Sequence, residues 1–119
     1  MQTKHAVDAL GALAHEYRLG IYRLLVEQGP AGLSAGAIAE TIGLAPSSLT
    51  FHLQNLHRAG LVTQERRSRE IIYAADFAAM NGLVGYLTEN CCGGNAVACA
   101  PQCVPATEIR KPKKSSRVA

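Results

Sequence analysis

Residues 44–61, LAPSSLTFHLQNLHRAGL, decide how the rest of this chain is interpreted. Leu49, Leu53 and Leu56 recur at the spacing of one face of an α-helix, so that face is expected to pack against a core. Pro46 suits the first turn of a helix, and Gly60 is typical of a residue just past its end. The opposite face is mostly polar and carries Ser47, Ser48, Thr50, Phe51, Gln54, Asn55 and Arg58. Such a face can hydrogen-bond bases and phosphates, although an ordinary surface helix has the same spacing.

The residues before this helix make the DNA-binding interpretation the stronger one. Ser34 is a suitable N-cap for a short helix over residues 35–41, in which Ile38 and Ile42 are expected to point inward. Gly43 then supplies a turn. A short helix, a glycine-containing turn and a second helix with one polar face form the helix-turn-helix pattern.

Residues 7–28 predict a further helix that is broken near His15. Val7, Leu10, Leu13 and Ala14 form one apolar row in its first half. The second half is apolar around much of its circumference, which indicates a central core helix that ends at Gly29 and Pro30.

After Gly60 the pattern changes to residues that favour strands, in segments 61–66 and 70–74. The two segments predict a β-hairpin whose tip holds Arg66, Arg67 and Arg69. A solvated turn would have the same composition. Next to a helix-turn-helix, the three arginines favour contact with phosphates or the minor groove.

A last helix is expected from Asp76, its N-cap, to about residue 90. Phe77, Met80, Val84 and Leu87 are spaced 3, 4 and 3 residues apart, so they can form a seam with a second copy of the chain or pack on the first helix. Beyond it lie an irregular cysteine-containing segment and a tail that is expected to be disordered.

Composition indicates one domain with an aliphatic core, because 48% of the 119 residues are hydrophobic and only 5% are aromatic. The net charge is +3, but residues 104–119 alone carry +4 and the remainder carries −1. A nucleic-acid site in the folded part must therefore be a local patch. The tail either adds non-specific attraction to DNA or keeps the protein soluble. No signal or membrane-spanning pattern occurs, so we expect a cytoplasmic protein with reduced cysteines.

The order of these elements resembles the ArsR/SmtB family of winged-helix metalloregulatory repressors. Residues 44–53 and 56–62 are similar to the recognition-helix signature of that family. Residues 14–19 are similar to the segment that usually leads into the core helix of its members. The resemblance covers roughly residues 5–90. It implies a mainly α fold with a small β-hairpin, a winged helix-turn-helix and a homodimer that binds a palindromic operator and leaves it when an inducer binds. Phe51, where many relatives have Arg or Lys, and Ser68-Arg69 at the hairpin tip depart from the family pattern.

The family's inducer sites differ among its members. Residues 34–45 contain no cysteine and no histidine follows His57, so two of the known sites have no counterpart here. Cys91-Cys92, followed by Cys99 and Cys103, resembles the arsenic-responsive members with a vicinal cysteine pair at the end of the last helix. Thiolates are soft ligands that select thiophilic centres. Adjacent cysteines on a regular helix point roughly 100° apart, so sharing one centre requires the helix end to fray, which Gly93 and Gly94 permit.

The sequence therefore predicts a homodimeric transcriptional repressor that binds double-stranded operator DNA and releases it on binding As(III) or Sb(III), including methylated As(III). We expect residues 1–90 to form the DNA-binding and dimerisation domain, 91–103 the inducer segment and 104–119 the basic tail. Candidate inducer ligands are Cys91, Cys92 and Cys99, with Cys103 as the alternative third thiol. A Zn, Cd or Pb sensor and a thiol–disulfide redox sensor remain alternatives. Nothing indicates an enzyme, since no phosphate loop, acid–base pair or nucleophile motif is present. The candidate DNA contacts are Ser47, Ser48, Thr50, Phe51, His52, Gln54, Arg66, Arg67 and Arg69.

Overall fold

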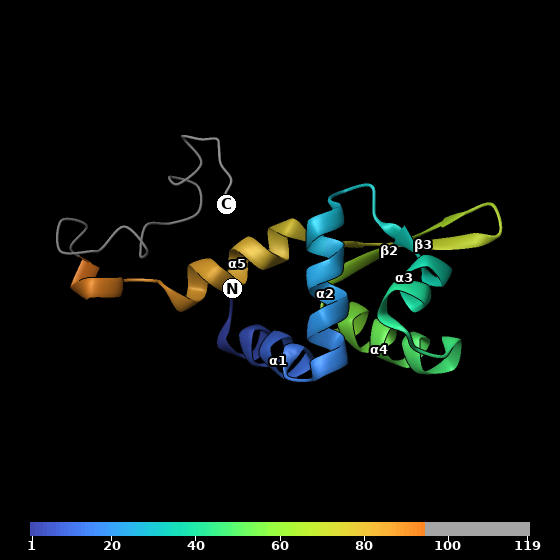
Figure 1. The fold of residues 1–119 in the computed structure, drawn as a ribbon. Coiled ribbons are helices and arrows are strands. Elements are labelled where there is room, and N and C mark those ends of the chain that lie inside the picture. The colour runs from blue at the N-terminus through green and yellow to red at the C-terminus, as the bar shows by residue number, and fades with distance from the viewer. Residues whose placement is uncertain (95–119) are drawn as a thin grey trace.

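The computed structural model describes residues 1–94 of the chain. It has five α-helices, a three-stranded sheet and a short 3₁₀ segment (Figure 1). In chain order these are α1 (Thr3–Leu13), α2 (Glu16–Gln28), β1 (Leu33–Ser34), α3 (Ala35–Ile42), α4 (Pro46–Arg58), β2 (Val62–Arg67), β3 (Glu70–Ala75), α5 (Phe77–Leu87) and η1 (Cys91–Gly94). Cys99, Cys103 and the basic tail lie outside the described residues. The predicted winged helix-turn-helix fold is confirmed in the part that the structure describes.

Local sequence signals explain most of these boundaries. The break between α1 and α2 falls at His15, whose Nδ1 accepts a hydrogen bond from the backbone N–H of Tyr17 at 3.2 Å and so caps α2. Ser34 caps α3 and Asp76 caps α5 in the same way, each accepting from a backbone N–H three residues later. Gly43 adopts the left-handed conformation (φ 83°) that lets the chain turn from α3 into α4.

The sheet is antiparallel with the order β1-β3-β2. β2 and β3 form the predicted hairpin, in which Gln64 pairs with Tyr73 and Arg67 with Glu70. The two-residue β1 was not predicted, and it pairs Leu33 with Tyr73. Its approach requires Gly32, because a Cβ at that position would lie 2.4 Å from the carbonyl oxygen of Tyr73. The hairpin and the C-terminal end of α5 lie at opposite ends of the molecule (Figure 1).

The core lies where α2, α4 and the sheet meet. Ile21, Leu25, Leu53 and Leu56 are fully buried there, which confirms α2 as the central helix and the leucine stripe of α4 as its packing face. Among residues 1–94, no helix is both long and apolar enough to cross a membrane.

The apolar row expected on α1 is largely turned away from the core of the subunit. Ala6, Ala9 and Ala12 are buried, whereas Val7 and Leu10 are 59% and 43% exposed. Close packing of α1 on its neighbours favours small side chains, so the larger residues are turned outward. The last helix is also shorter than predicted, because α5 ends at Leu87 and Thr88 is its C-cap.

Candidate DNA-binding surface and cysteine segment

The exposed face of α4 is held by a buried stripe on the same helix. Leu49, Leu53 and Leu56 are at most 1% exposed, so the rotation of α4 about its axis is fixed. The structure therefore brings most of the predicted reading residues to the surface together: Ser47, Ser48, Thr50, Phe51 and Gln54. Their hydroxyl and amide groups match the donors and acceptors on base edges and phosphates.

Several polar side chains of α4 already make hydrogen bonds along the helix. The Thr50 hydroxyl donates to the carbonyl oxygen of Pro46 at 2.9 Å, so its lone pairs remain available as acceptors. Asn55 donates to the carbonyl oxygen of Phe51, and Arg58 donates to the Asn55 side chain. These bonds restrict the rotamers of Thr50 and Asn55 before any ligand arrives.

Phe51 is the large apolar residue on this face, with 58% of its surface exposed. Its ring meets the His52 ring edge-on, with 5.6 Å between the centroids. An exposed aromatic ring held in this way can make apolar contact with a thymine methyl group.

His52 differs from the rest of the predicted set because its side chain is only 8% exposed. Position 52 lies beside Leu49, Leu53 and Leu56 on the packed side of α4, so the imidazole does not reach the exposed face. Its ring lies 4.7 Å from the His15 ring, at the junction of α1 and α2. The contact links the recognition helix to the corner where the first two helices meet.

Burial lowers the pKa of His52, and the nearby His15 and Arg18 lower it further. Its Nδ1 atom is buried and has no hydrogen-bond partner among the described residues. His52 is therefore held as a neutral ring at neutral pH, which fits a packing role in the helix junction better than a charged contact to phosphate.

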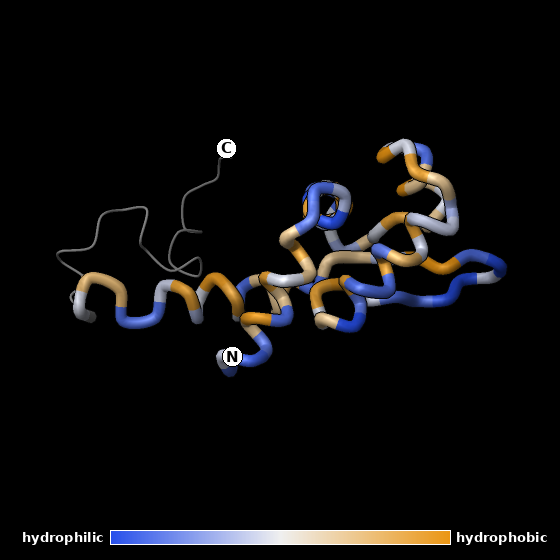
Figure 2. Tube along the Cα trace, turned by 90° about the horizontal axis from the view of Figure 1, so that it is seen from below, coloured by the Kyte–Doolittle hydropathy of each residue, from blue (hydrophilic) through white to orange (hydrophobic). Residues whose placement is uncertain are grey.

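The three arginines of the wing do not form one cluster. Side chains alternate along a strand, so Arg66 lies on the same face as Gln64 whereas Arg67 lies on the opposite face. The Arg67 guanidinium donates to the Glu65 carboxylate at 3.1 Å, and both groups are more than half exposed. Arg69 lies at the tip after Ser68, whose φ of 55° makes the tight turn that a glycine or asparagine usually makes. In Figure 2 the tip is the hydrophilic end of the molecule.

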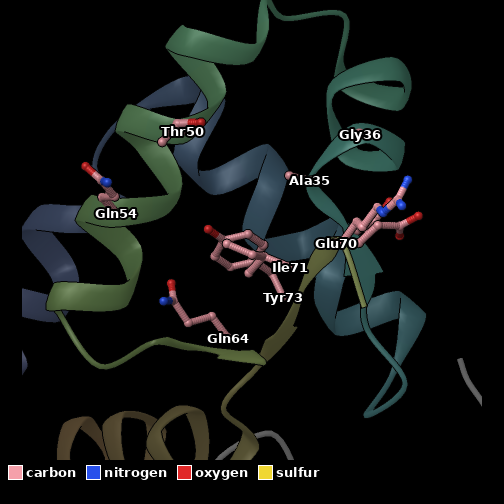
Figure 3. Close-up of a pocket in the computed structure, with 10 residues that line it drawn as sticks. Ala35, Gly36, Thr50, Gln54, Gln64, Glu70, Ile71 and Tyr73 are labelled. Carbon is pink, nitrogen blue, oxygen red and sulfur yellow. The ribbon is translucent and has the colours of Figure 1, made fainter. Parts of the chain in front are cut away.

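A hollow of about 480 Å³ separates the recognition helix from the wing (Figure 3). Thr50 and Gln54 of α4 line one side, and Gln64, Ile71 and Tyr73 of the hairpin line the other. The remaining lining residues are Ser34, Ala35, Gly36, Arg69 and Glu70. Thr50, Gln54 and Arg69 were predicted from the sequence. Gln64 and Tyr73 were not, because the strand register that brings them beside α4 is not visible in a linear pattern.

The described cysteines lie beyond the last helix. α5 ends at Leu87, and Cys91 and Cys92 belong to the 3₁₀ segment η1, in which Cys92 and Gly93 have φ values of 56° and 68°. Cys91 is partly buried and Cys92 is exposed. Because this backbone is not α-helical, the two thiols are not held at the 100° separation of neighbouring residues on a regular helix. Within residues 1–94, no group of three or more Cys, His, Asp or Glu side chains is placed to hold a metal ion.

Large apolar side chains are exposed on the outer face of both α1 and α5. Val7 and Leu10 on α1 and Val84 and Leu87 on α5 are each at least 43% exposed, and the two helices contact each other. Next to this face an apolar groove of about 410 Å³ lies between α2 and α5, lined by residues such as Leu19, Tyr22, Met80 and Leu83. Exposed apolar area of this kind is typical of a protein–protein interface.

Comparison with known proteins places this geometry in a family. A helix-turn-helix domain model matches residues 13–65. The chain is 30% identical to the HTH-type transcriptional regulator YgaV of Escherichia coli K12 over 89 residues, which cover 75% of this chain and 88% of YgaV. It superposes on an ArsR-like transcriptional regulator from Rhodococcus sp. RHA1 with a TM-score of 0.61 and 31% identity, covering 71% of this chain and 76% of that one. This chain belongs to the ArsR family of winged helix-turn-helix transcriptional regulators.

A second solved structure bears on assembly. The DNA-binding domain of Mb0332 from Mycobacterium bovis, described as homodimeric and as a possible ArsR-family regulator, has a TM-score of 0.58 and 27% identity. The match covers 78% of this chain and 86% of that domain. Membership of the ArsR family makes this chain a DNA-binding regulator of transcription and not an enzyme.

Proposed function

We propose that this ArsR-family protein is a homodimeric repressor that releases its operator when trivalent arsenic or antimony binds its C-terminal cysteines. The observation that carries the proposal is the position of Cys91 and Cys92, four and five residues beyond the end of a helix whose exposed face is apolar. A ligand held by these thiols acts next to the surface that would join two subunits.

In the proposed complex, α4 lies in the major groove. Ser47, Ser48, Thr50, Phe51 and Gln54 face the base edges, while Arg66, Arg67 and Arg69 face the flanking backbone and minor groove. His52 supports α4 from beneath, since its side chain is buried. The burial of the α4 leucines supports this mode, because a recognition helix must hold a fixed rotation to present one face.

Two observations support the dimer. Val7, Leu10, Val84 and Leu87 expose apolar surface that the rest of residues 1–94 does not cover. The homodimeric mycobacterial relative has the same fold. A two-fold axis near α1 and α5 would carry two copies of α4 to half-sites about one helical turn apart, roughly 34–36 Å.

The choice of inducer depends on the chemistry of thiolates. Soft thiolate ligands favour trivalent arsenic or antimony over hard cations. Trivalent arsenic takes three sulfur ligands, so Cys91 and Cys92 need a third thiol from Cys99 or Cys103, both outside the described residues. Cys99 is the better candidate, because the loop that it closes back to Cys92 is shorter. A monomethylated trivalent arsenical would need only two thiols.

The path from the cysteines to the dimer surface is short. Thr88 caps α5 by donating to the carbonyl oxygen of Val84 at 2.9 Å, and only Glu89 and Asn90 separate this residue from Cys91. The sequence suggested that inducer binding would fray the end of a regular helix. Because α5 already ends at Leu87, inducer binding would instead reorganise the turn that follows it. A difference of about 3 kcal/mol between the two dimer conformations would lower operator affinity more than a hundredfold.

A redox sensor is the second candidate, favoured by the two adjacent cysteines in a non-helical turn. Oxidation of two thiols to a disulfide would change the same segment without a metal. A Zn, Cd or Pb sensor is less favoured. Zinc sites normally have two to four residues between paired cysteines, a spacing that Cys99 and Cys103 have but the adjacent Cys91 and Cys92 do not.

Serine variants of all four cysteines test the proposal. The assay measures release of a fluorescent duplex, selected from a random pool by the wild-type protein, under a phosphine reductant that offers no competing dithiol. We expect Cys91→Ser and Cys92→Ser to bind DNA like the wild type and to ignore arsenite, while Cys103→Ser responds nearly normally. Loss of the arsenite response in Cys99→Ser supports the three-thiol site.

Two outcomes would contradict this assignment. If all four variants still release DNA when arsenite is added, the sensor lies elsewhere in the chain. If the wild type ignores arsenite but releases DNA on treatment with a thiol oxidant, and reductant reverses the release, the redox candidate replaces it.

A further inference from the structure

The hollow between α4 and the wing is lined by two polar side chains, Gln64 and Tyr73, that were not predicted to bind DNA. Gln64 and Tyr73 are direct partners in the β2–β3 register, so their side chains are neighbours on one face of the sheet. Both point toward α4, where Thr50 and Gln54 line the facing wall (Figure 3). Polar side chains from two strands and a helix thus line one concave surface.

Tyr73 is the most firmly positioned of these residues. It is 6% exposed, and it lies on the central strand with Leu33 on one side and Gln64 on the other. Its hydroxyl makes no hydrogen bond within residues 1–94, and the hydroxyl oxygen remains accessible to solvent through the hollow. Burial of the ring raises the pKa of Tyr73, which keeps the hydroxyl protonated and able to donate. A rigid donor that opens into a hollow and lacks a partner indicates a ligand that accepts a hydrogen bond.

The position of the hollow identifies that acceptor. In the proposed DNA complex α4 occupies the major groove and the wing reaches the neighbouring minor groove. The sugar-phosphate strand that separates two neighbouring grooves then has to pass between α4 and the wing, where the hollow lies. Hydroxyl and amide side chains are common hydrogen-bond partners of phosphate oxygens.

We propose that Tyr73 and Gln64 bind one backbone phosphate of the operator in the hollow between α4 and the wing. This inference rests on the proposed DNA-binding mode and adds a contact that carries no sequence information. Arg69 supplies positive charge at the same hollow, and the Glu70 carboxylate, which also lines it, opposes the anion. The site is therefore balanced by one cation and one anion, and neutral donors supply the remaining attraction.

Neutral donors leave a signature that distinguishes them from arginines. The salt dependence of DNA binding reports the number of phosphates neutralised by cations, so losing a neutral hydrogen bond does not change it. We expect Tyr73→Phe and Gln64→Ala each to weaken binding about tenfold, to the selected duplex and to a mixed-sequence duplex alike, with an unchanged salt slope. Arg69→Ala should reduce that slope by about one. Glu70→Gln should tighten binding to both duplexes, because it removes a repelling charge.

Fluorescence anisotropy at several salt concentrations provides these values, with Gln28→Ala, at an exposed position on α2, as the control away from the hollow. A duplex carrying one uncharged methylphosphonate, moved stepwise along each strand, locates the contact. At one position the methylphosphonate should lower the affinity of the wild type but should not lower the affinity of Tyr73→Phe any further. Circular dichroism confirms that each variant is folded.

Any one of three results would overturn the inference. Tyr73→Phe and Gln64→Ala could bind DNA within twofold of the wild type, or they could lose affinity for the selected duplex alone. The effects of Tyr73→Phe and of the methylphosphonate on affinity could also be additive at every position. All of these are measured without inducer, so they do not depend on the cysteine site. If the wild type binds neither duplex, the proposed function fails instead.

Discussion

Replacing Val84 by aspartate should separate the dimer without unfolding the subunit. Val84 is 43% exposed on α5, and fully burying a valine side chain stabilises by roughly 1.5–3 kcal/mol. Covering the exposed part is then worth about 1 kcal/mol per subunit, or about 2 kcal/mol for both copies at a two-fold interface. Burying an aspartate side chain in its place costs at least about 1–2 kcal/mol per subunit. Together these terms raise the dissociation constant of the dimer by about a thousandfold or more.

Sedimentation equilibrium over a range of protein concentrations measures this change directly. Leu87→Asp, at a position that is 58% exposed, should have the same effect. Ala31→Asp adds the same charge at an exposed position outside α1 and α5 and should leave the dimer intact. At protein concentrations low enough for the control to dissociate as well, the melting temperature of Val84→Asp should match that of the control. A Val84→Asp protein that stays dimeric at wild-type concentrations refutes the interface, and a monomer that binds the selected duplex as tightly as the wild type refutes the need for a dimer.

Two further predictions concern the subunit itself. His52 has a lowered pKa in the folded protein, so the unfolded chain binds more protons than the folded chain between that pKa and about 6.5. The free energy of unfolding should therefore fall as the pH drops through this window. In His52→Gln, the free energy of unfolding measured in urea should depend less on pH there. An unchanged slope of stability against pH in His52→Gln would show that another group titrates. Gly32→Ala should lower the free energy of unfolding by about 2 kcal/mol or more, because the φ of 72° and the 2.4 Å approach to the Tyr73 carbonyl oxygen both exclude a Cβ. Gly20→Ala, within α2 and with open space around it, should be tolerated.

The fold was largely predictable because its boundaries are set by neighbours in the sequence. Ser34, Gly43, Pro46 and Asp76 act on backbone groups within a few residues, so their roles can be inferred without knowing the tertiary structure. The same holds for the leucine stripe of α4. The short strand β1 escaped prediction because two residues carry no periodic signal.

Which side of α1 is buried within the subunit could not be inferred from the sequence, for a physical reason. Hydropathy ranks Val7 and Leu10 above the alanines, but the distance between packed helices is set by side-chain volume as well as by polarity. Ala6, Ala9 and Ala12 allow α1 to lie close to its neighbours, which leaves the larger residues outside. A pattern that describes one chain cannot separate surface buried within a subunit from surface that a second subunit would cover.

The candidate site divides in the same way. The exposed residues of α4 could be predicted because they lie on the side of the helix opposite an apolar stripe that is visible in the sequence. The burial of His52, the separation of Arg66 from Arg67 and the pairing of Gln64 with Tyr73 depend on helix rotation and strand register, which only the assembled fold determines.

The charge arrangement of the wing also bears on how quickly the protein finds DNA. Residues 65–70 contain three arginines and two glutamates, and Arg67 is paired with Glu65, so the wing has a net charge of only +1. Salt screens exposed charges over about 8 Å at physiological ionic strength, and a net charge of +1 gives the wing little attraction for DNA beyond that distance. In the proposed DNA complex the wing would therefore act after contact and slow dissociation. Long-range attraction that raises the association rate has to come from elsewhere, and residues 104–119, with a net charge of +4, are the part of the sequence able to supply it.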